Sequence, residues 1–224
     1  MSSQCVRPLS PEPLAPWAMP MPGAPRMSVG ELSTRPDDSW QHELIDGRLV
    51  RMPPGGGEAS RIALCLGGRL LVYVEEHRLG EVTRADGGYD LGPSGFPDTE
   101  LGPDVAFVRG ERVPPRDSPA YRKAWPVAPD LAVEVASPNQ YRPEMAAKAR
   151  LYMATGTRLG WVVWPRARKV DIWHPGDEGP SATLGIGDSL AGEDAASGFS
   201  YPLADLFRSF AEAAGGGTLI AVLE

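Results

Sequence analysis

The chain has 224 residues and carries 22 Lys and Arg against 29 Asp and Glu, which gives a formal net charge of −7. This length supports one substantial hydrophobic core, so we expect a single α/β domain. The acidic balance argues against non-specific binding to polyanions, and contact with nucleic acid therefore requires a local basic patch. The two cysteines, Cys5 and Cys65, provide neither a disulfide framework nor the spacing of a metal site, which favours a reducing cytoplasm.

Residues 1–26 contain prolines that interrupt any run able to serve as the apolar core of a signal peptide. Later in the chain no apolar run is long enough to span a bilayer, so we expect no membrane association. Because residues 1–26 cannot bury enough apolar surface to offset the entropy of ordering them, we predict a disordered tail. The predicted domain then covers residues 27–210, and a C-terminal tail covers 211–224.

The first predicted elements of the domain are a short helix within 28–41, a hairpin and a long helix. Residues 42–52, HELIDGRLVRM, have two strand-like halves around Asp46-Gly47, a dipeptide that favours a tight turn because glycine accepts positive φ. Residues 58–78 have the apolar spacing of one helix face, at Ile62, Leu66, Leu70 and Val74. Gly67-Gly68 is predicted to be a weak spot in this helix.

The rest of the chain alternates short apolar runs with one further helix. A helix is predicted over 142–156, with proline in its first turn and glycine at its end, as helix termini prefer. Strands are predicted within 80–92, 103–110, 129–138, 158–165, 169–175 and the start of 182–207. The order hairpin, helix, strands, helix, strands predicts an α/β fold in which helices pack on one mixed sheet.

Two acidic residues interrupt or open the apolar strand patterns. Glu134 lies between Val133 and Val135, where a buried carboxylate costs several kcal/mol unless it is paired, protonated or bound to a metal. Asp104 opens the strand run at 103–110, and the two carboxylates converge if these strands are neighbours. A divalent cation would relieve their repulsion, and Mg²⁺ prefers oxygen ligands. This combination is typical of a site that cleaves phosphodiesters.

Five segments of the sequence together resemble a known family. HELIDGRLVRM, GPDVAFV, APDLAVEVASPN, the spacing of Lys148 and Tyr152 in KARLY, and GWVVWP occur in the order found in Uma-type restriction endonucleases, members of the PD-(D/E)XK nuclease superfamily. The resemblance covers about residues 28 to 207. It implies a restriction-endonuclease-like fold, with a central mixed β-sheet flanked by helices.

The resemblance also assigns roles to individual residues. It implies that Asp104 and Glu134 are the first and second metal-binding acids and that Glu43 is an additional one. The lysine that usually follows the second acid by two residues is replaced by Ala136, and Lys148 is the expected substitute. Together these four residues, Glu43, Asp104, Glu134 and Lys148, form the implied catalytic set. The implied cofactor is Mg²⁺, with Mn²⁺ as a substitute, the substrate is DNA, and a homodimer supplies two sites for two strands.

Three positions depart from the family pattern. Trp164 stands before Pro165 where an acid is usual, Ala59 replaces a histidine, and Glu144 replaces an aspartate. These departures keep a second hypothesis open: a catalytically inactive protein of the same fold that acts as a DNA-binding or protein-interaction module. A third hypothesis is a metal-dependent hydrolase of another phosphate ester.

Each proposed site residue also has an ordinary structural explanation. Strand alternation would turn Glu134 toward solvent, and Glu43 would be a surface acid at the start of the hairpin. Asp104 would form an Asx-type turn. Lys148 would be a solvated helix residue paired with Glu144 at i, i+4. Tyr152 would be an aromatic at the edge of the core.

Overall fold

The computed structural model describes residues 19–20, 25–36, 38, 40–52, 56–138 and 140–208. Most of the predicted N-terminal tail and all of 211–224 lie outside these ranges. Within the described residues, no helix combines the length and the apolar character needed to cross a membrane.

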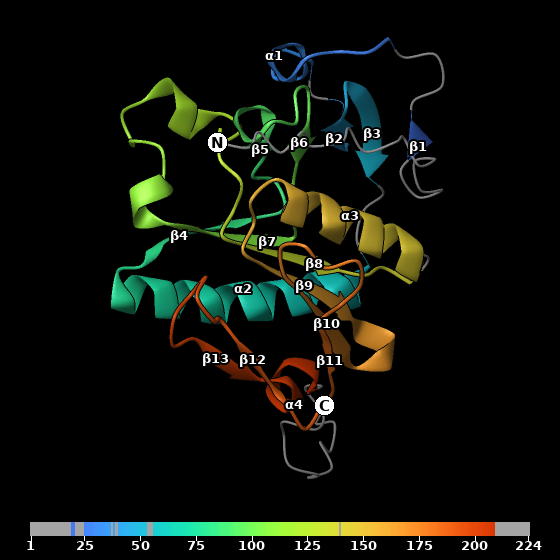
Figure 1. The fold of residues 1–224 in the computed structure, drawn as a ribbon, viewed down its shortest axis with the longest axis vertical. Helices are drawn as coiled ribbons and strands as arrows, with labels where there is room; N and C mark the ends of the chain where they lie inside the picture. Colours follow the sequence, from blue (N-terminus) through green and yellow to red (C-terminus); the bar gives the residue numbers. More distant parts are fainter. Residues whose placement is uncertain are drawn as a thin grey trace, which may run out of the picture.

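A six-stranded mixed sheet forms the centre of the described structure (Figure 1). Its strands lie in the order β11 (Ala182–Leu184), β10 (Lys169–Trp173), β9 (Leu159–Trp164), β8 (Leu131–Val135), β7 (Val105–Arg109) and β4 (Gly80–Arg84). Only β8 and β9 run parallel among these neighbours, because the helix α3 (Arg142–Ala154) carries the chain back between them. The predicted strands and the second helix are therefore confirmed.

The predicted hairpin belongs to a separate sheet rather than to the central one. Strands β2 (Gln41–Ile45) and β3 (Arg48–Met52) pair antiparallel, and Asp46 and Gly47 have φ of 50° and 71° at the turn. They form the five-stranded order β1 (Met19–Pro20), β3, β2, β6 (Glu100–Leu101) and β5 (Tyr89–Asp90). The expectation of a single mixed sheet was wrong on this point, because strand patterns do not identify which strands pair.

The remaining α-helices and β-strands are short and lie toward the two ends of the described chain. Helix α1 (Val29–Leu32) precedes the hairpin and is capped by Ser28 and Glu31. Strands β12 (Ser189–Ala191) and β13 (Ser200–Pro202) pair with each other, and α4 (Leu203–Phe207) follows. The segments between strands also contain 3₁₀ turns at Gly92–Ser94, Gly110–Arg112, Pro119–Arg122 and Pro165–Ala167.

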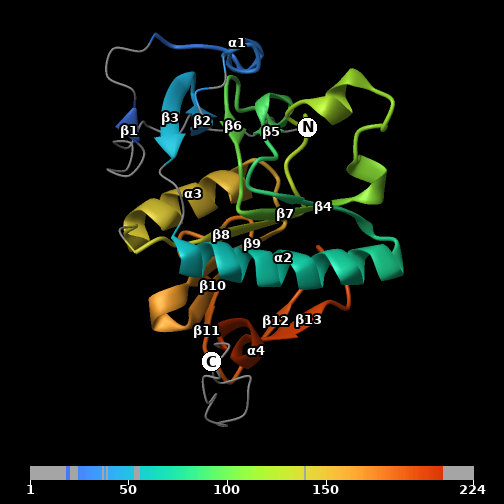
Figure 2. The same ribbon diagram turned by 180° about the vertical axis from the view of Figure 1, so that it is seen from behind.

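The two long helices cover opposite faces of the large sheet. Helix α2 (Gly57–His77) buries Ile62, Leu66, Leu70 and Val74 against one face, as its spacing predicted. A Cβ at Gly67 would lie 3.2 Å from Val105 Cγ2, so this glycine lets α2 approach β7 closely. Helix α3 covers the other face and lies between the large sheet and the five-stranded sheet (Figures 1 and 2). The layer around α3 is where chain segments from both sheets meet.

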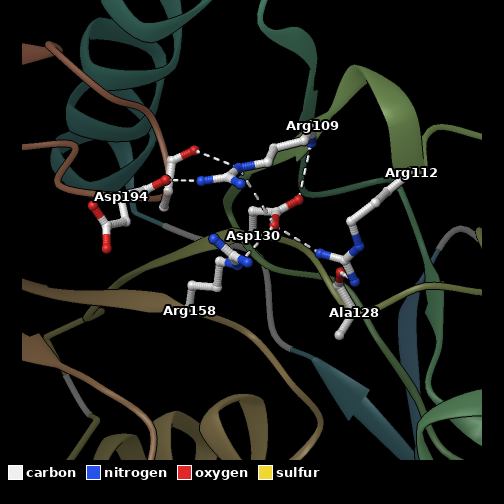
Figure 3. A network of polar contacts seen from close by, with 7 residues as sticks. Arg109, Arg112, Ala128, Asp130, Arg158 and Asp194 are labelled. Atoms are coloured by element: carbon white, nitrogen blue, oxygen red, sulfur yellow. Dashed lines mark hydrogen bonds and ion pairs between the residues drawn. The ribbon is translucent and has the colours of Figure 1, made fainter.

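An ion-pair network anchors the beginning of β8 (Figure 3). The fully buried carboxylate of Asp130 accepts a hydrogen bond from the backbone N–H of Arg109 at 2.9 Å. The guanidinium groups of Arg112 and Arg158 lie 2.8 and 3.6 Å from its Oδ1. Arg109 also donates to the carbonyls of Asp194 and Ala195, which ties the C-terminal loop to the same point. This network fixes the start of the strand that carries Glu134.

Candidate active site

Glu134 points from β8 toward α3. On this strand Leu131, Val133 and Val135 pack in the core under α2, whereas Ala132 packs in the core under α3. Glu134 shares the second face because side chains alternate along a strand. It is only 6% exposed, so the solvent-facing explanation was wrong. The structure thus contains a buried carboxylate in the middle of its central strand.

Asp104 immediately precedes the neighbouring strand β7 and lies opposite Glu134. The antiparallel pairing of Val105 with Val133, continued by one residue, places Asp104 opposite Glu134 and on the same face of the sheet. The backbone N–H of Val135 donates to Asp104 Oδ2 at 2.7 Å. Asp104 is therefore fixed by a bond across the sheet, and β7 and β8 are neighbours, which was the condition for the two acids to converge.

Glu43 reaches the same point from the five-stranded sheet. It lies on β2 and its side chain is fully buried, so it is not the surface acid of the alternative explanation. The backbone N–H of Gly102 donates to its Oε1 at 3.0 Å. Its Oε2 is buried without a hydrogen-bond partner among the described residues. A buried acceptor without a donor is costly, and it marks a place where a cation would be favourable.

Lys148 joins the two glutamates. From the middle of α3 its Nζ lies 2.8 Å from Glu43 Oε1 and 2.9 Å from Glu134 Oε1. The carboxylate of Glu144, one turn earlier on the helix, accepts from the backbone N–H of Tyr141 at 3.3 Å and caps α3. Lys148 is 5% exposed, so the explanation as a solvated helix residue was wrong.

Tyr152 also belongs to this site, although the sequence pattern assigned it to the edge of the core. It is fully buried, and its hydroxyl donates to Glu134 Oε1 at 2.9 Å. Its spacing of four residues from Lys148 places both side chains on one face of α3. That spacing was the available signal, because two polar groups at i, i+4 reach the same neighbour.

The electrostatics of the cluster follow from burial and from the excess of acids. Burial raises the pKa of Glu134 to about 8, Lys148 opposes this shift, and Asp104 and Glu43 add to it. Burial likewise raises the pKa of Asp104, against its bond from Val135 and the charge of Lys148. Burial lowers the pKa of Lys148, but the charges of Glu134 and Glu43 more than offset this and the net shift is upward. Lys148 therefore remains an ammonium at neutral pH.

The donor set fits a hard cation in its chemistry. The three acids offer carboxylate oxygens, which are the ligands that Mg²⁺ prefers, and Glu43 Oε2 is a buried oxygen without a donor. Within the described ranges, however, no group of three or more His, Cys, Asp or Glu side chains is arranged as a ready metal site. In this structure the ammonium of Lys148 contacts Oε1 of both glutamates.

A hollow of about 360 Å³ adjoins the cluster, lined by Trp40, Gln41, His42, Ala85, Asp86, Gly88, Glu100, Leu101 and Gly102. Gly102 links the two features, because its N–H donates to Glu43. Glu100 carries a pKa raised to about 7 by burial, then by the charges of Asp90 and Glu43. The hollow is therefore acidic on the side nearest the cluster, which disfavours an anion there unless a cation is present.

The positions that depart from the family pattern have other contacts. Trp164 donates through Nε1 to Asp171 Oδ2 at 2.7 Å, and the guanidinium of Arg142 stacks 4.6 Å from its ring centroid. Arg142 also pairs with Asp171 at 3.1 Å. Ala59 is a residue of α2 and packs in the core between this helix and the large sheet, on the face of the sheet opposite Glu134. Asp171 was missed by the sequence reasoning; its contacts fix Arg142 at the first turn of α3.

Comparison with known proteins found a matching family model and a similar solved structure. A family model described as "Uma2: Putative restriction endonuclease" matches residues 29–204. A solved structure from Anabaena variabilis ATCC 29413, described as a putative nuclease belonging to DUF820, is similar with a TM-score of 0.67 and 20% identity. The match covers 81% of this chain and 97% of that chain. The predicted restriction-endonuclease-like fold is confirmed. No curated protein sequence matches the chain.

Proposed function

Because the chain belongs to the Uma2 family of restriction endonucleases, we propose that it is a Mg²⁺-dependent nuclease that hydrolyses the phosphodiester bonds of DNA. The observation that carries the proposal is the cluster of Glu43, Asp104, Glu134 and Lys148, which four separate segments bring to one buried point. These segments are far apart in the sequence, and their convergence in an apolar core requires a compensating benefit.

Asp104, Glu134 and Glu43 would hold the metal, with Mn²⁺ as a substitute for Mg²⁺. When bound, such an ion supplies a water of lowered pKa and stabilises the charge that develops on the phosphate. Val135 N–H holds Asp104 and Tyr152 OH holds Glu134, so neither carboxylate has to be ordered when a cation arrives. A preorganised set of ligands limits the entropy lost on binding.

Lys148 would serve the reaction through its charge. In the absence of a cation its ammonium balances Glu43 and Glu134, from 2.8 and 2.9 Å. Its position beside the acids allows it to orient a water or to contact a phosphate oxygen. This is the task of the lysine that the family pattern places two residues after the second acid, where this chain has Ala136. A second copy of the chain would provide the second site needed for both strands of a duplex.

The alternative of an inactive binding module of the same fold has one specific observation in its favour. Lys148 engages Oε1 of both glutamates, so it competes directly with a metal for two of the three acids. Trp164 in place of the family's acid points in the same direction. Hydrolysis of another phosphate ester would be recognised by activity on small phosphodiesters and none on DNA.

Cleavage of supercoiled plasmid with Mg²⁺ or Mn²⁺ tests the proposal. The wild type is compared with Asp104→Asn, Glu134→Gln and, as a matched control, the exposed acid in Glu111→Gln. We expect cleavage by the wild type and the control, and a loss of at least about 100-fold in the two site variants. Equal cleavage by all four proteins would indicate a contaminating nuclease. Binding of Mn²⁺ by the wild type without cleavage would favour the binding module.

A further inference from the structure

The outer face of α2 carries an ordered stripe of residues that the proposed nuclease site does not use. Arg61, Leu64, Gly68, Leu71 and Glu75 follow one another at intervals of three and four residues, so they lie along one side of the helix. This side is opposite the buried residues Ile62, Leu66, Leu70 and Val74. Figure 2 shows α2 running across the near face of the molecule.

The middle of this stripe is apolar and open. Leu64 is 75% exposed, Leu71 39% and the adjacent Val72 53%. A Cβ at Gly68 would meet no atom within 4 Å, in contrast to the close contact at Gly67. Single exposed apolar residues are common on proteins, but several aligned around a glycine on one helix face are typical of a helix-packing surface. The glycine would let a second backbone approach closely.

The two ends of the stripe carry opposite charges, with Arg61 toward the start of α2 and Glu75 toward its end. In an antiparallel arrangement centred on Gly68, Arg61 of each copy faces Glu75 of the other. Leu64 of each copy likewise faces Val72 of the other. The two members of each pair are equally far from Gly68 along the helix, in opposite directions. A parallel arrangement would instead bring equal charges together, which costs free energy. The stripe is therefore complementary to itself in one orientation.

We propose that the outer face of α2 is the homodimer interface, in which two copies of this helix pack antiparallel across a two-fold axis at Gly68. The proposal gives a surface to the dimer of the proposed function. It commits to a second copy of this chain because the charge pattern is self-complementary, as an interface across a two-fold axis must be. One helix pair lies at the small end of protein interfaces, so we expect a dissociation constant on the order of 10 µM.

Sedimentation velocity of the full chain over a wide range of concentration tests this interface. We expect the wild type to pass from monomer to dimer as its concentration rises. Arg61→Glu and Glu75→Arg should each raise the dissociation constant about tenfold or more, because each places equal charges opposite one another. The double variant R61E/E75R should restore dimerisation, because it reverses the pair. Leu64→Glu should abolish it, and the control Ile186→Glu, at another exposed apolar residue, should not alter it.

The outcomes that would overturn the proposal are a wild type that stays monomeric throughout, single variants that dimerise normally, or a double variant that is not restored. A monomeric wild type would leave residues 209–224 as the segment to test against this face. Thermal unfolding of each variant controls for folding, since Arg61 also donates to the carbonyl of Leu206. The measurement needs neither DNA nor metal, so its failure and the failure of the nuclease proposal are distinguishable.

Discussion

Among single residues, Glu134 is the buried acid at the centre of the proposed site. Its carboxyl group is buried beside Asp104 and Glu43, and its pKa is raised from its ordinary value of 4.5 to about 8. A group whose pKa is higher in the folded state than in the unfolded chain stabilises the fold below the unfolded pKa. That stability is lost as the pH rises through the folded value.

This linkage predicts how stability depends on pH. The free energy of unfolding of the wild type should fall between about pH 4.5 and pH 8 relative to that of Glu134→Gln. Urea unfolding of both proteins across this range measures the difference. Because Asp104 and Glu100 shift in the same direction, the difference between the two proteins isolates Glu134. If the wild type instead became more stable relative to Glu134→Gln as the pH rises, the pKa of Glu134 would not be raised in the folded protein.

Lys148 is predicted to hold the acids together. Lys148→Met leaves Glu43 and Glu134 without their ammonium in a buried site, so the free energy of unfolding at neutral pH should fall by about 3 kcal/mol. The loss should be smaller at acid pH, where the carboxyl groups are protonated. Chemical denaturation at both pH values checks this. The exposed Lys169→Met is the control and should change stability by less than about 0.5 kcal/mol.

Tyr152 is predicted to position Glu134 rather than to react. Tyr152→Phe removes one hydrogen bond to a carboxylate and should cost about 1.5 kcal/mol of stability. It should weaken the binding of Mn²⁺, measured by calorimetry, less than Glu134→Gln does. Equal loss of Mn²⁺ affinity in both variants would show that the hydroxyl has a more direct role than orientation.

At the scale of elements, the two adjacent glycines of α2 have opposite surroundings. Gly68→Ala should stabilise the monomer by about 1 kcal/mol, since alanine is the better helix former and nothing lies near the new methyl group. At Gly67 the new methyl group would press on Val105 Cγ2 at 3.2 Å, so this gain should be cancelled or reversed. Thermal unfolding at low protein concentration measures the two variants as a pair. Equal stabilisation by both would contradict the close packing of α2 on β7.

The network at the start of β8 gives another test at this scale. Asp130→Ala removes the acceptor of Arg109 N–H and the counter-ion of Arg112 and Arg158. The arginines are partly exposed, so we expect a loss of about 3 kcal/mol, at the low end for a broken buried ion pair. Denaturant unfolding provides the value. A change under about 1 kcal/mol would show that the arginines are solvated when Asp130 is absent.

The sequence predicts the elements better than it predicts their assembly. Periodicity identified α2, and the Asp46-Gly47 turn identified the hairpin, because both signals are local. The position of the hairpin in a second sheet depends on pairing between β2 and β6, which no local pattern encodes. For the same reason the burial of Lys148 was not predicted: it follows only once β2 brings Glu43 to α3. Asp104 and Glu134 could be singled out from the sequence because each acid opens or interrupts an apolar strand pattern, but their alignment follows only from the pairing of β7 with β8.

At the scale of the whole molecule, a net charge of −7 has to be reconciled with a polyanionic substrate. Binding of DNA would depend on local arginines and lysines and on metal ions that neutralise the acidic cluster. We therefore expect cleavage to fall as the salt concentration rises. Binding of the protein releases cations from the DNA, and this release becomes less favourable at higher salt concentration. Plasmid cleavage at increasing KCl with constant Mg²⁺ measures this dependence. Cleavage that is independent of salt would argue against contacts with the phosphate backbone.

Glu43, Asp104 and Glu134 are proposed to form together a site for a divalent metal ion. The direct test is a crystal structure of the protein with Mn²⁺, in which anomalous scattering locates the ion. We predict a peak at coordination distance from the carboxylates of Asp104 and Glu134, with Glu43 Oε2 turned toward it. Mn²⁺ bound elsewhere, or an unchanged Lys148 bridge between the two glutamates at saturating Mn²⁺, would show that the three acids do not form a metal site.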